Sequence, residues 1–143
     1  MVRVQLLILI LFLCSGCAQG GAGGPYARNF VFGEDATTLD AEQLRALDKM
    51  AEDVSAPFYR KDTVCVSAVR VSSARDDAEA EQINHRIKFV MLGLVYKGVK
   101  ADRIVRGVKQ TPATRQLGDG RFQTRVVDVF LAPAESGPED CVR

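Results

Sequence analysis

Residues 84–112 read NHRIKFVMLGLVYKGVKADRIVRGVKQTP, and the fold assignment rests on this stretch. It begins inside an expected helix over residues 79–97. The apolar residues that recur on one side of that helix are Ile83, Ile87, Val90, Met91 and Leu94. Gly98 stops the helix, because glycine readily adopts the left-handed conformation that follows a last helical turn. We expect a short strand over residues 103–105 directly afterwards.

A second helix is expected upstream of this stretch. Asp40 is its expected N-cap, with Gln43 at the capping-box spacing and with Leu39 and Leu44 at the positions of a hydrophobic staple. The residues that then recur at helical spacing are Leu44, Leu47, Ala51 and Val54. We expect this whole stripe to face a core.

Three further segments are typical of strands. Residues 30–32 form a short apolar run, and residues 63–71 are β-branched and apolar on both faces, as in a central covered strand. A long final strand is expected over residues 122–131, after a loop that contains Pro112, Gly118 and Gly120. Residues 132–143 are expected to be irregular. The order βαβαββ predicts an α/β (α+β) two-layer sandwich.

The first residues are typical of an export signal. Arg3 gives a positive start, an unbroken apolar run follows, and small residues precede Cys17. That run suits a signal peptide and is too short to span a bilayer. The pattern resembles a lipobox with Cys14 in place of the usual leucine, so we expect a signal over residues 1–16 and acylation of Cys17. Ordinary cleavage after Ala18, with soluble secretion, is the alternative.

The expected anchor has consequences for location. Residues 17–29 would form a glycine-rich tether between the acylated cysteine and a domain over residues 30–131. Two or three acyl chains anchor a protein stably, since each buried methylene contributes about 0.8 kcal/mol. Ala18 is not the aspartate of an inner-membrane retention signal. We therefore expect an outer-membrane lipoprotein whose domain faces the periplasm.

The charge balance excludes one class of partner. The chain has 19 Lys and Arg against 18 Asp and Glu, and loss of Arg3 with the signal leaves 18 of each. A neutral chain lacks the basic excess of a nucleic-acid binder. No long apolar segment follows the signal, so no further membrane span is expected.

Besides Cys17, two cysteines remain after the expected cleavage, Cys65 in the expected domain and Cys141 in the tail that follows it. Exported chains can form disulfides. We expect a bond between these two, which would stabilise the fold by roughly 4 kcal/mol in the chain-entropy model. The alternative is a small buried hydrophobic residue at Cys65 and a free tail thiol at Cys141.

The sequence carries no recognisable enzyme signature. The only histidine, His85, lacks companions at metal-ligand spacing, so we expect a surface histidine and no metal site. No Ser/His/Asp or Cys/His set is recognisable. We therefore expect a protein that is not an enzyme and has no cofactor.

The stretch quoted above resembles the OmpA-like C-terminal domain family, best known for gripping peptidoglycan. The family phrase K-G-V-x-x-x-R-I matches residues 97–104, and residues 30–32 match an F-x-F opening. Gly107 and the pair Arg125-Val126 match the family's later strands. The resemblance covers nearly the whole mature domain and implies a mixed sheet with two main helices.

The resemblance also implies a ligand site. In the family, an aspartate ending the second strand and an arginine fifteen residues later face the ammonium and carboxylate of diaminopimelate. Arg86 stands at the arginine position, but Val71 stands at the aspartate position, and Arg70 beside it adds a cation. A valine cannot accept a hydrogen bond from an ammonium group. The acidic residues that could replace the missing anion are Asp76, Asp77 and Glu79.

Two alternatives remain open for these arginines. Arg86 could be a retained ligand group, or it could be a solvated or salt-bridged helix residue, which we favour. Arg125 could likewise be structural, pairing across strands near the edge of the sheet.

A retained fold with a lost ligand aspartate indicates a structural or protein-interaction module, because function depends on the site rather than on the fold. We expect the module to belong to a cell-envelope assembly of the secretion-system or pilus type. The expected partners are a membrane, through acyl chains on Cys17, and envelope proteins. The alternative is a peptidoglycan-binding lipoprotein that tethers the outer membrane to the cell wall.

Overall fold

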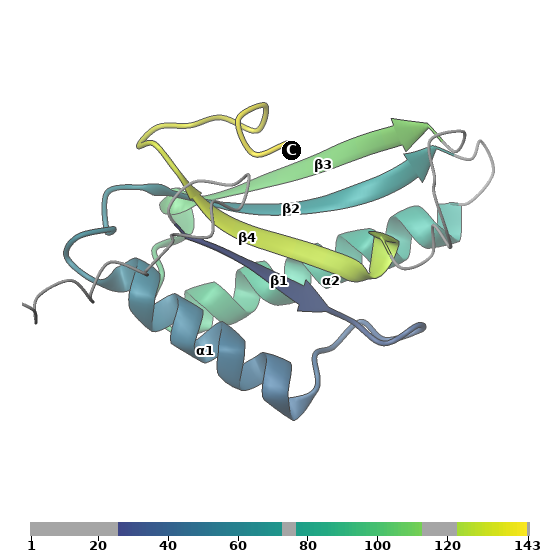
Figure 1. The fold of residues 1–143 in the computed structure, drawn as a ribbon, viewed down its shortest axis with the longest axis horizontal. Helices are drawn as coiled ribbons and strands as arrows, with labels where there is room; N and C mark the ends of the chain where they lie inside the picture. The colour runs from purple at the N-terminus through teal and green to yellow at the C-terminus, as the bar shows by residue number, and fades with distance from the viewer. Residues whose placement is uncertain (1–25, 73–76, 113–122, 143) are drawn as a thin grey trace, which may run out of the picture.

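The computed structural model describes residues 26–72, 77–112 and 123–142. Its elements in chain order are β1 (Ala27–Val31), α1 (Ala41–Ser55), β2 (Thr63–Ser72), α2 (Asp77–Tyr96), the 3-10 turn η1 (Ala101–Arg103), β3 (Ile104–Pro112), the 3-10 turn η3 (Gln123–Arg125) and β4 (Val126–Ala132) (Figure 1). The predicted signal peptide, Cys17, Asp76, Gly118 and Gly120 lie outside the described residues.

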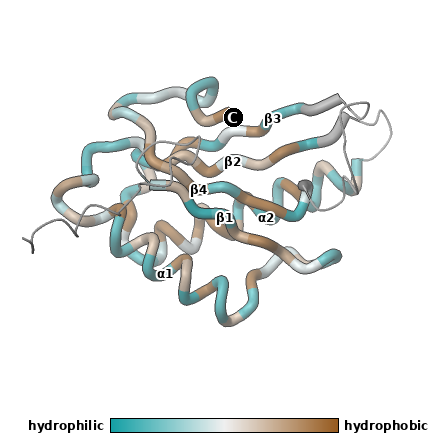
Figure 2. The backbone as a smooth tube through the Cα atoms, in the orientation of Figure 1, coloured by the Kyte–Doolittle hydropathy of each residue, from teal (hydrophilic) through white to brown (hydrophobic). Residues whose placement is uncertain are grey.

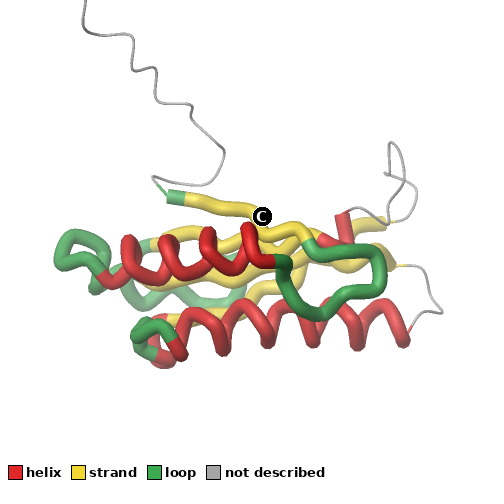
Figure 3. Tube along the Cα trace, turned by 90° about the horizontal axis from the view of Figure 1, so that it is seen from below, coloured by secondary structure: helices red, strands yellow, loops and turns green. Residues whose placement is uncertain are grey.

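The four strands form one mixed sheet in the order β1-β4-β2-β3. β4 runs antiparallel to both of its neighbours, whereas β2 and β3 are parallel. Both helices cover the same face of this sheet, as the view from below shows (Figure 3). The predicted βαβαββ two-layer sandwich, with a mixed sheet and two main helices, is therefore confirmed.

β2 is the central strand of the layered core. Val64, Val66 and Ala68 are buried in the cluster that the helices cover, and Cys65 and Ser67 are buried on the other face. A strand that is covered on both faces is expected to be continuously apolar, which is what the sequence predicted. Figure 2 shows that apolar stretches occur in both layers, in strands as well as in helices.

The start of α1 agrees with the sequence, but one face does not. The Asp40 carboxylate accepts a hydrogen bond from the backbone N–H of Gln43 at 2.8 Å, which is an N-cap. The Gln43 side chain accepts from the N–H of Val31 at 3.1 Å instead of closing a capping box, so it links α1 to β1. The buried residues of the helix are Leu47, Met50, Ala51 and Val54. The prediction that Leu44 faces the core is wrong, since Leu44 is 39% exposed. The buried stripe of α1 contains Met50 in its place.

The later strands differ in length from those predicted. β3 has nine residues rather than residues 103–105 alone, and its ladder with β2 runs from Ile104 beside Val64 to Pro112 beside Ser72. Pro112 therefore ends a strand instead of belonging to a loop. The exposed residues Arg106, Lys109 and Gln110 hid this strand, because edge strands often carry polar side chains.

The starts of the first and last strands also differ from those predicted. β1 begins at Ala27, inside the predicted tether, because its backbone pairs with β4 as far as Ala27 beside Phe130. β4 begins at Val126 rather than at residue 122, and η3 precedes it.

Arg103 fixes the turn after α1. α2 ends at Tyr96, and Gly98, two positions later, has the left-handed conformation predicted for the residue that stops this helix, with a φ of 101°. Arg103 then donates hydrogen bonds to the carbonyl oxygens of Asp62 (2.9 Å), Val54 (3.0 Å) and Tyr59 (2.7 Å). One of these carbonyls belongs to the last turn of α1, where carbonyls have no partner within the helix. A single side chain thus holds the end of α1 and the start of β2 together.

The segment after β4 covers the face of the sheet opposite the helices. Cys65 and Cys141 form a disulfide, with 1.96 Å between the Sγ atoms, and it joins the central strand to this segment. Phe130 and Ala132 complete a small apolar cluster around the bond. Gly107 gives the segment room, because a Cβ atom there would lie 2.7 Å from the carbonyl carbon of Cys141.

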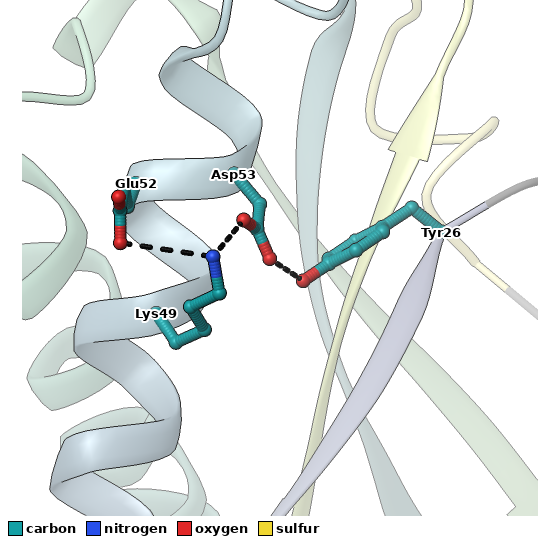
Figure 4. A network of polar contacts seen from close by, with 4 residues as sticks. All are labelled: Tyr26, Lys49, Glu52 and Asp53. Atoms are coloured by element: carbon teal, nitrogen blue, oxygen red, sulfur yellow. Dashed lines mark hydrogen bonds and ion pairs between the residues drawn. The ribbon is translucent and has the colours of Figure 1, made fainter.

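Tyr26, directly before β1, joins the sheet to α1 (Figure 4). Its hydroxyl donates to Asp53 Oδ2 at 2.6 Å, and Lys49 Nζ donates to Asp53 Oδ1 at 2.7 Å. Burial raises the pKa of Tyr26 to about 12, and the hydrogen bond to Asp53 raises it as well. The hydrogen bond from Lys49, followed by that from Tyr26, lowers the pKa of Asp53.

Replacing Tyr26 by phenylalanine removes the bond to Asp53 and keeps the ring. We expect the free energy of unfolding to fall by about 1 kcal/mol at neutral pH. The pKa of Tyr26 is raised from 10.0 to about 12, so the unfolded chain loses this proton first and the wild-type advantage declines as pH rises through that window. Urea unfolding of both proteins at several pH values measures the difference. A difference that stays constant up to pH 12 would contradict the raised pKa.

Replacing Gly107 by alanine pushes a methyl group into the backbone of Cys141. We expect a loss of about 1–3 kcal/mol in the free energy of unfolding, the usual cost of overpacking. The same substitution should cost less in a chain carrying Cys65→Ala and Cys141→Ala, because the covering segment can then move away. Urea unfolding of the four proteins gives the coupling. An equal cost in both backgrounds would mean that the clash lies elsewhere.

Candidate functional site

Arg86 lies in the middle of α2 and is almost fully buried, with 1% of its surface exposed. Its donors bind two segments that are distant in sequence, the loop after β1 and the turn η3. The accepting carbonyl oxygens are those of Ala36 (2.8 Å), Gly33 (3.1 Å), Glu34 (2.8 Å) and Thr124 (3.0 Å). One side chain therefore ties the helix layer to both segments.

These bonds use most of what Arg86 can offer. A guanidinium group has five N–H donors, and four of them point to carbonyls here. The Phe32 ring lies beside the group, with 5.6 Å from Cζ to the ring centroid. The expectation that Arg86 is a solvated or salt-bridged helix residue is wrong, because the side chain is buried and its hydrogen bonds go to the backbone.

Two charged side chains act on Arg86 in addition to the carbonyl groups. Burial lowers the pKa of the Arg86 guanidinium most, and the nearby Arg125 lowers it further, whereas the carboxylate of Asp35 raises it. Asp35 is exposed and belongs to the loop whose carbonyls Arg86 binds. We call the group formed by Asp35, Arg86 and Arg125 the arginine site.

Asp35 was not among the predicted anions. The signal that could have identified it is the acidic pair Glu34-Asp35, which follows the opening at residues 30–32 almost directly. Sequence reasoning concentrated on the acidic residues before α2, because the family aspartate lies at the end of the second strand. A loop contributed by β1 was not considered.

Two of the three predicted anions lie at the start of α2, before Arg86 in the chain. Asp77 is exposed and Glu79 is half-buried, and both belong to the first turn of the helix. Seven residues separate Glu79 from Arg86, which corresponds to about 10 Å along a helix axis. Asp76 lies outside the described residues. Among the described residues, Asp35 is the carboxylate that raises the pKa of the Arg86 guanidinium.

The position of the missing aspartate is part of the sheet. Val71 pairs with Thr111 in the ladder between β2 and β3, and the preceding Arg70 is half-buried. Arg125 is the last residue of η3, directly before β4, and its carbonyl oxygen accepts a hydrogen bond from the N–H of Phe32 at 2.9 Å. This bond holds Arg125 at the point where β1 ends and β4 begins.

Other predicted features can be located on the surface. His85 is exposed, with Nε2 3.6 Å from Glu81 Oε1. Within residues 26–72, 77–112 and 123–142, no group of three or more His, Cys, Asp or Glu side chains is placed to hold a metal ion. In that same part of the chain, no helix has the length and apolar character needed to cross a bilayer.

Comparison with known proteins gives matches by structure alone. No protein-family model and no curated protein sequence matches the chain. The OmpA-like domain of FopA1 from Francisella tularensis matches with 20% identity and a TM-score of 0.55, over 76% of this chain and 73% of that one. The peptidoglycan-associated lipoprotein from Burkholderia pseudomallei matches with 15% identity and a TM-score of 0.57, over 73% and 90% of the two chains.

A third similar structure is the C-terminal domain of MotB from Helicobacter pylori. It has 13% identity and a TM-score of 0.56, over 76% of this chain and 86% of that one. At such identities the similarity is one of fold. The two helices on one face of a four-stranded mixed sheet therefore give this chain the OmpA-like fold.

Proposed function

We propose that this chain is a non-enzymatic outer-membrane lipoprotein whose OmpA-like domain is a structural, protein-interaction module of a cell-envelope assembly, such as a secretion system or pilus. The observation that carries the proposal is that the Arg86 side chain donates four hydrogen bonds to backbone carbonyls. Val71 stands where a ligand carboxylate would be needed. A zwitterionic peptide stem requires a matched cation and anion.

An envelope location has two kinds of support. The sequence begins with a signal that resembles a lipobox and places Cys17 at the expected cleavage site. The similar structures include a lipoprotein described as peptidoglycan-associated and a MotB domain described as periplasmic. The assembly itself is proposed by analogy with such proteins.

Asp35 favours a second candidate function, which is peptidoglycan binding that tethers the outer membrane to the cell wall. Its carboxylate is exposed and close enough to raise the pKa of Arg86. An exposed carboxylate beside a guanidinium group can accept the ammonium of diaminopimelate. At most one N–H of Arg86 then remains for the ligand carboxylate, because the other four donate to the backbone.

Purified sacculi separate the two functions. The proposed function predicts that the detergent-solubilised full chain is retained on sacculi no better than the Asp35→Ala variant. Asp35 is exposed, so its loss should leave the fold intact. Glu42→Ala, which removes an exposed acid from the first turn of α1, is the matched control. Strong retention that Asp35→Ala abolishes and Glu42→Ala preserves would establish peptidoglycan binding instead.

The structural role of Arg86 predicts a large effect on stability. Arg86→Lys keeps the charge but loses the planar set of donors, so several buried carbonyls lose their partner. We expect the free energy of unfolding to fall by about 3 kcal/mol or more. Lys88→Ala, which changes an exposed cation of the same helix, should cost less than about 0.5 kcal/mol. Similar urea midpoints for the two variants would show that Arg86 does not support the fold.

A further inference from the structure

The domain has two distinct ends (Figure 1), and the segments that Arg86 binds, the loop after β1 and the turn η3, lie at only one of them. We call the end where β1 begins and both helices finish the proximal end. The distal end holds the loop after β1 and the turn η3. In Figure 3 the turn after α1 and the turn after α2 lie at the same, proximal end. Hydrogen bonds from Arg103 to the carbonyls of Tyr59 and Asp62 join these two turns.

The proximal end exposes large apolar side chains. Phe58, in the turn after α1, and Tyr96, the last residue of α2, are each 86% exposed. Leu92 and Val95 are exposed on the last two turns of α2. Across the described residues, six large hydrophobic side chains are exposed, and four of them lie toward this end. Isolated exposed hydrophobic residues are ordinary, whereas a gathering of them marks a contact surface.

Basic side chains accompany these apolar ones. Arg60 and Lys61 follow Phe58 in the same turn, and Lys100 follows α2. All three are exposed, and none forms an ion pair within the part of the chain that the structure describes. Their charge is available to an anionic surface.

The acidic groups nearby face other cations. Asp48 pairs with Lys97, with 3.2 Å between the carboxylate and Nζ. The carboxylates of Asp62 and Asp102 raise the pKa of the Arg103 guanidinium, although burial lowers that pKa more strongly. None of the three carboxylates forms an ion pair with Arg60, Lys61 or Lys100.

The chain enters the domain beside the exposed aromatic ring. The Tyr26 and Tyr59 ring centroids lie 6.2 Å apart, and those of Phe58 and Tyr59 lie 4.9 Å apart. Cys17 precedes Tyr26 by nine positions, a length of chain that can extend at most about 30 Å. An acylated Cys17 would therefore keep Phe58 close to the bilayer, where even weak contacts are favoured by the high effective concentration.

We propose that the proximal end docks on a membrane surface that contains anionic lipids. Phe58 and Tyr96 enter the headgroup region, where aromatic side chains are favoured. Arg60, Lys61 and Lys100 face the lipid phosphates. The inference rests on the proposed acylation of Cys17. It directs the arginine site away from the bilayer, toward the space in which a partner would lie.

Single tryptophans can report the orientation, because the chain has no tryptophan of its own. Phe58→Trp and Tyr96→Trp probe the proximal end. Leu44→Trp is the matched control, since Leu44 is an exposed apolar residue at the distal start of α1. Each acylated full chain is reconstituted into vesicles of phosphatidylethanolamine and phosphatidylglycerol with brominated acyl chains, and tryptophan quenching is measured.

We expect the lipids to quench Phe58→Trp and Tyr96→Trp roughly twofold or more strongly than Leu44→Trp. Phosphatidylcholine vesicles, or the added pair Arg60→Glu and Lys61→Glu, should reduce that difference. Equal quenching of the three variants would overturn membrane docking, because it would mean that the domain has no fixed orientation.

Flotation of the vesicles tests the anchor separately. A chain that floats and shows equal quenching retains the proposed anchor and overturns docking alone. A chain that does not float contradicts the acylation of Cys17 and the docking with it. If crosslinked envelope protein shields Phe58→Trp from iodide while the lipids leave it unquenched, the proximal end is a protein interface and docking is overturned.

Discussion

The hydrogen bonds from Arg86 to four backbone carbonyls are the contact on which the distal half of the domain depends. They bring the loop after β1 and the turn before β4 against the same helix. The pairing of β1 with β4 starts beside this point, where the N–H of Phe32 meets the carbonyl of Arg125. A helix residue thus determines where two strands of the other layer begin and end.

The same contact limits what the site can bind. A guanidinium group with four of its five N–H donors bound to backbone carbonyls is a structural element, and its charge is balanced largely by carbonyl dipoles. Asp35 gives this site a ligand-like feature, because its carboxylate is exposed and raises the pKa of Arg86. The chemistry of the site therefore depends on a loop residue, whereas the fold depends on the arginine.

The sequence predicted those elements whose pattern is apolar and periodic. Side-chain spacing predicted the central strand and most of the buried stripe of α1 with its Asp40 cap. The conformational freedom of glycine predicted the left-handed Gly98 just after α2. The length of β3 did not, because an edge strand with exposed cations has no apolar alternation to reveal it.

The site was predictable only in part. The position of Arg86 came from a resemblance, and its burial could not be seen because its partners are carbonyls, which every residue has. Asp35 was missed because its proximity to Arg86 arises from a contact between residues some fifty positions apart. Leu44 was placed in the core because spacing alone does not tell which edge of a stripe is covered.

The buried Arg86 and the half-buried Arg103 hold opposite ends of the domain through carbonyl oxygens rather than through carboxylates. Neither partner in such a contact gains or loses a proton in mildly acidic surroundings. Acidification that would protonate a carboxylate partner, as at Asp53, leaves both fastenings intact. The arginine-to-carbonyl hydrogen bonds that hold the two ends of the domain therefore persist at acidic pH values that would weaken a fold held by ion pairs.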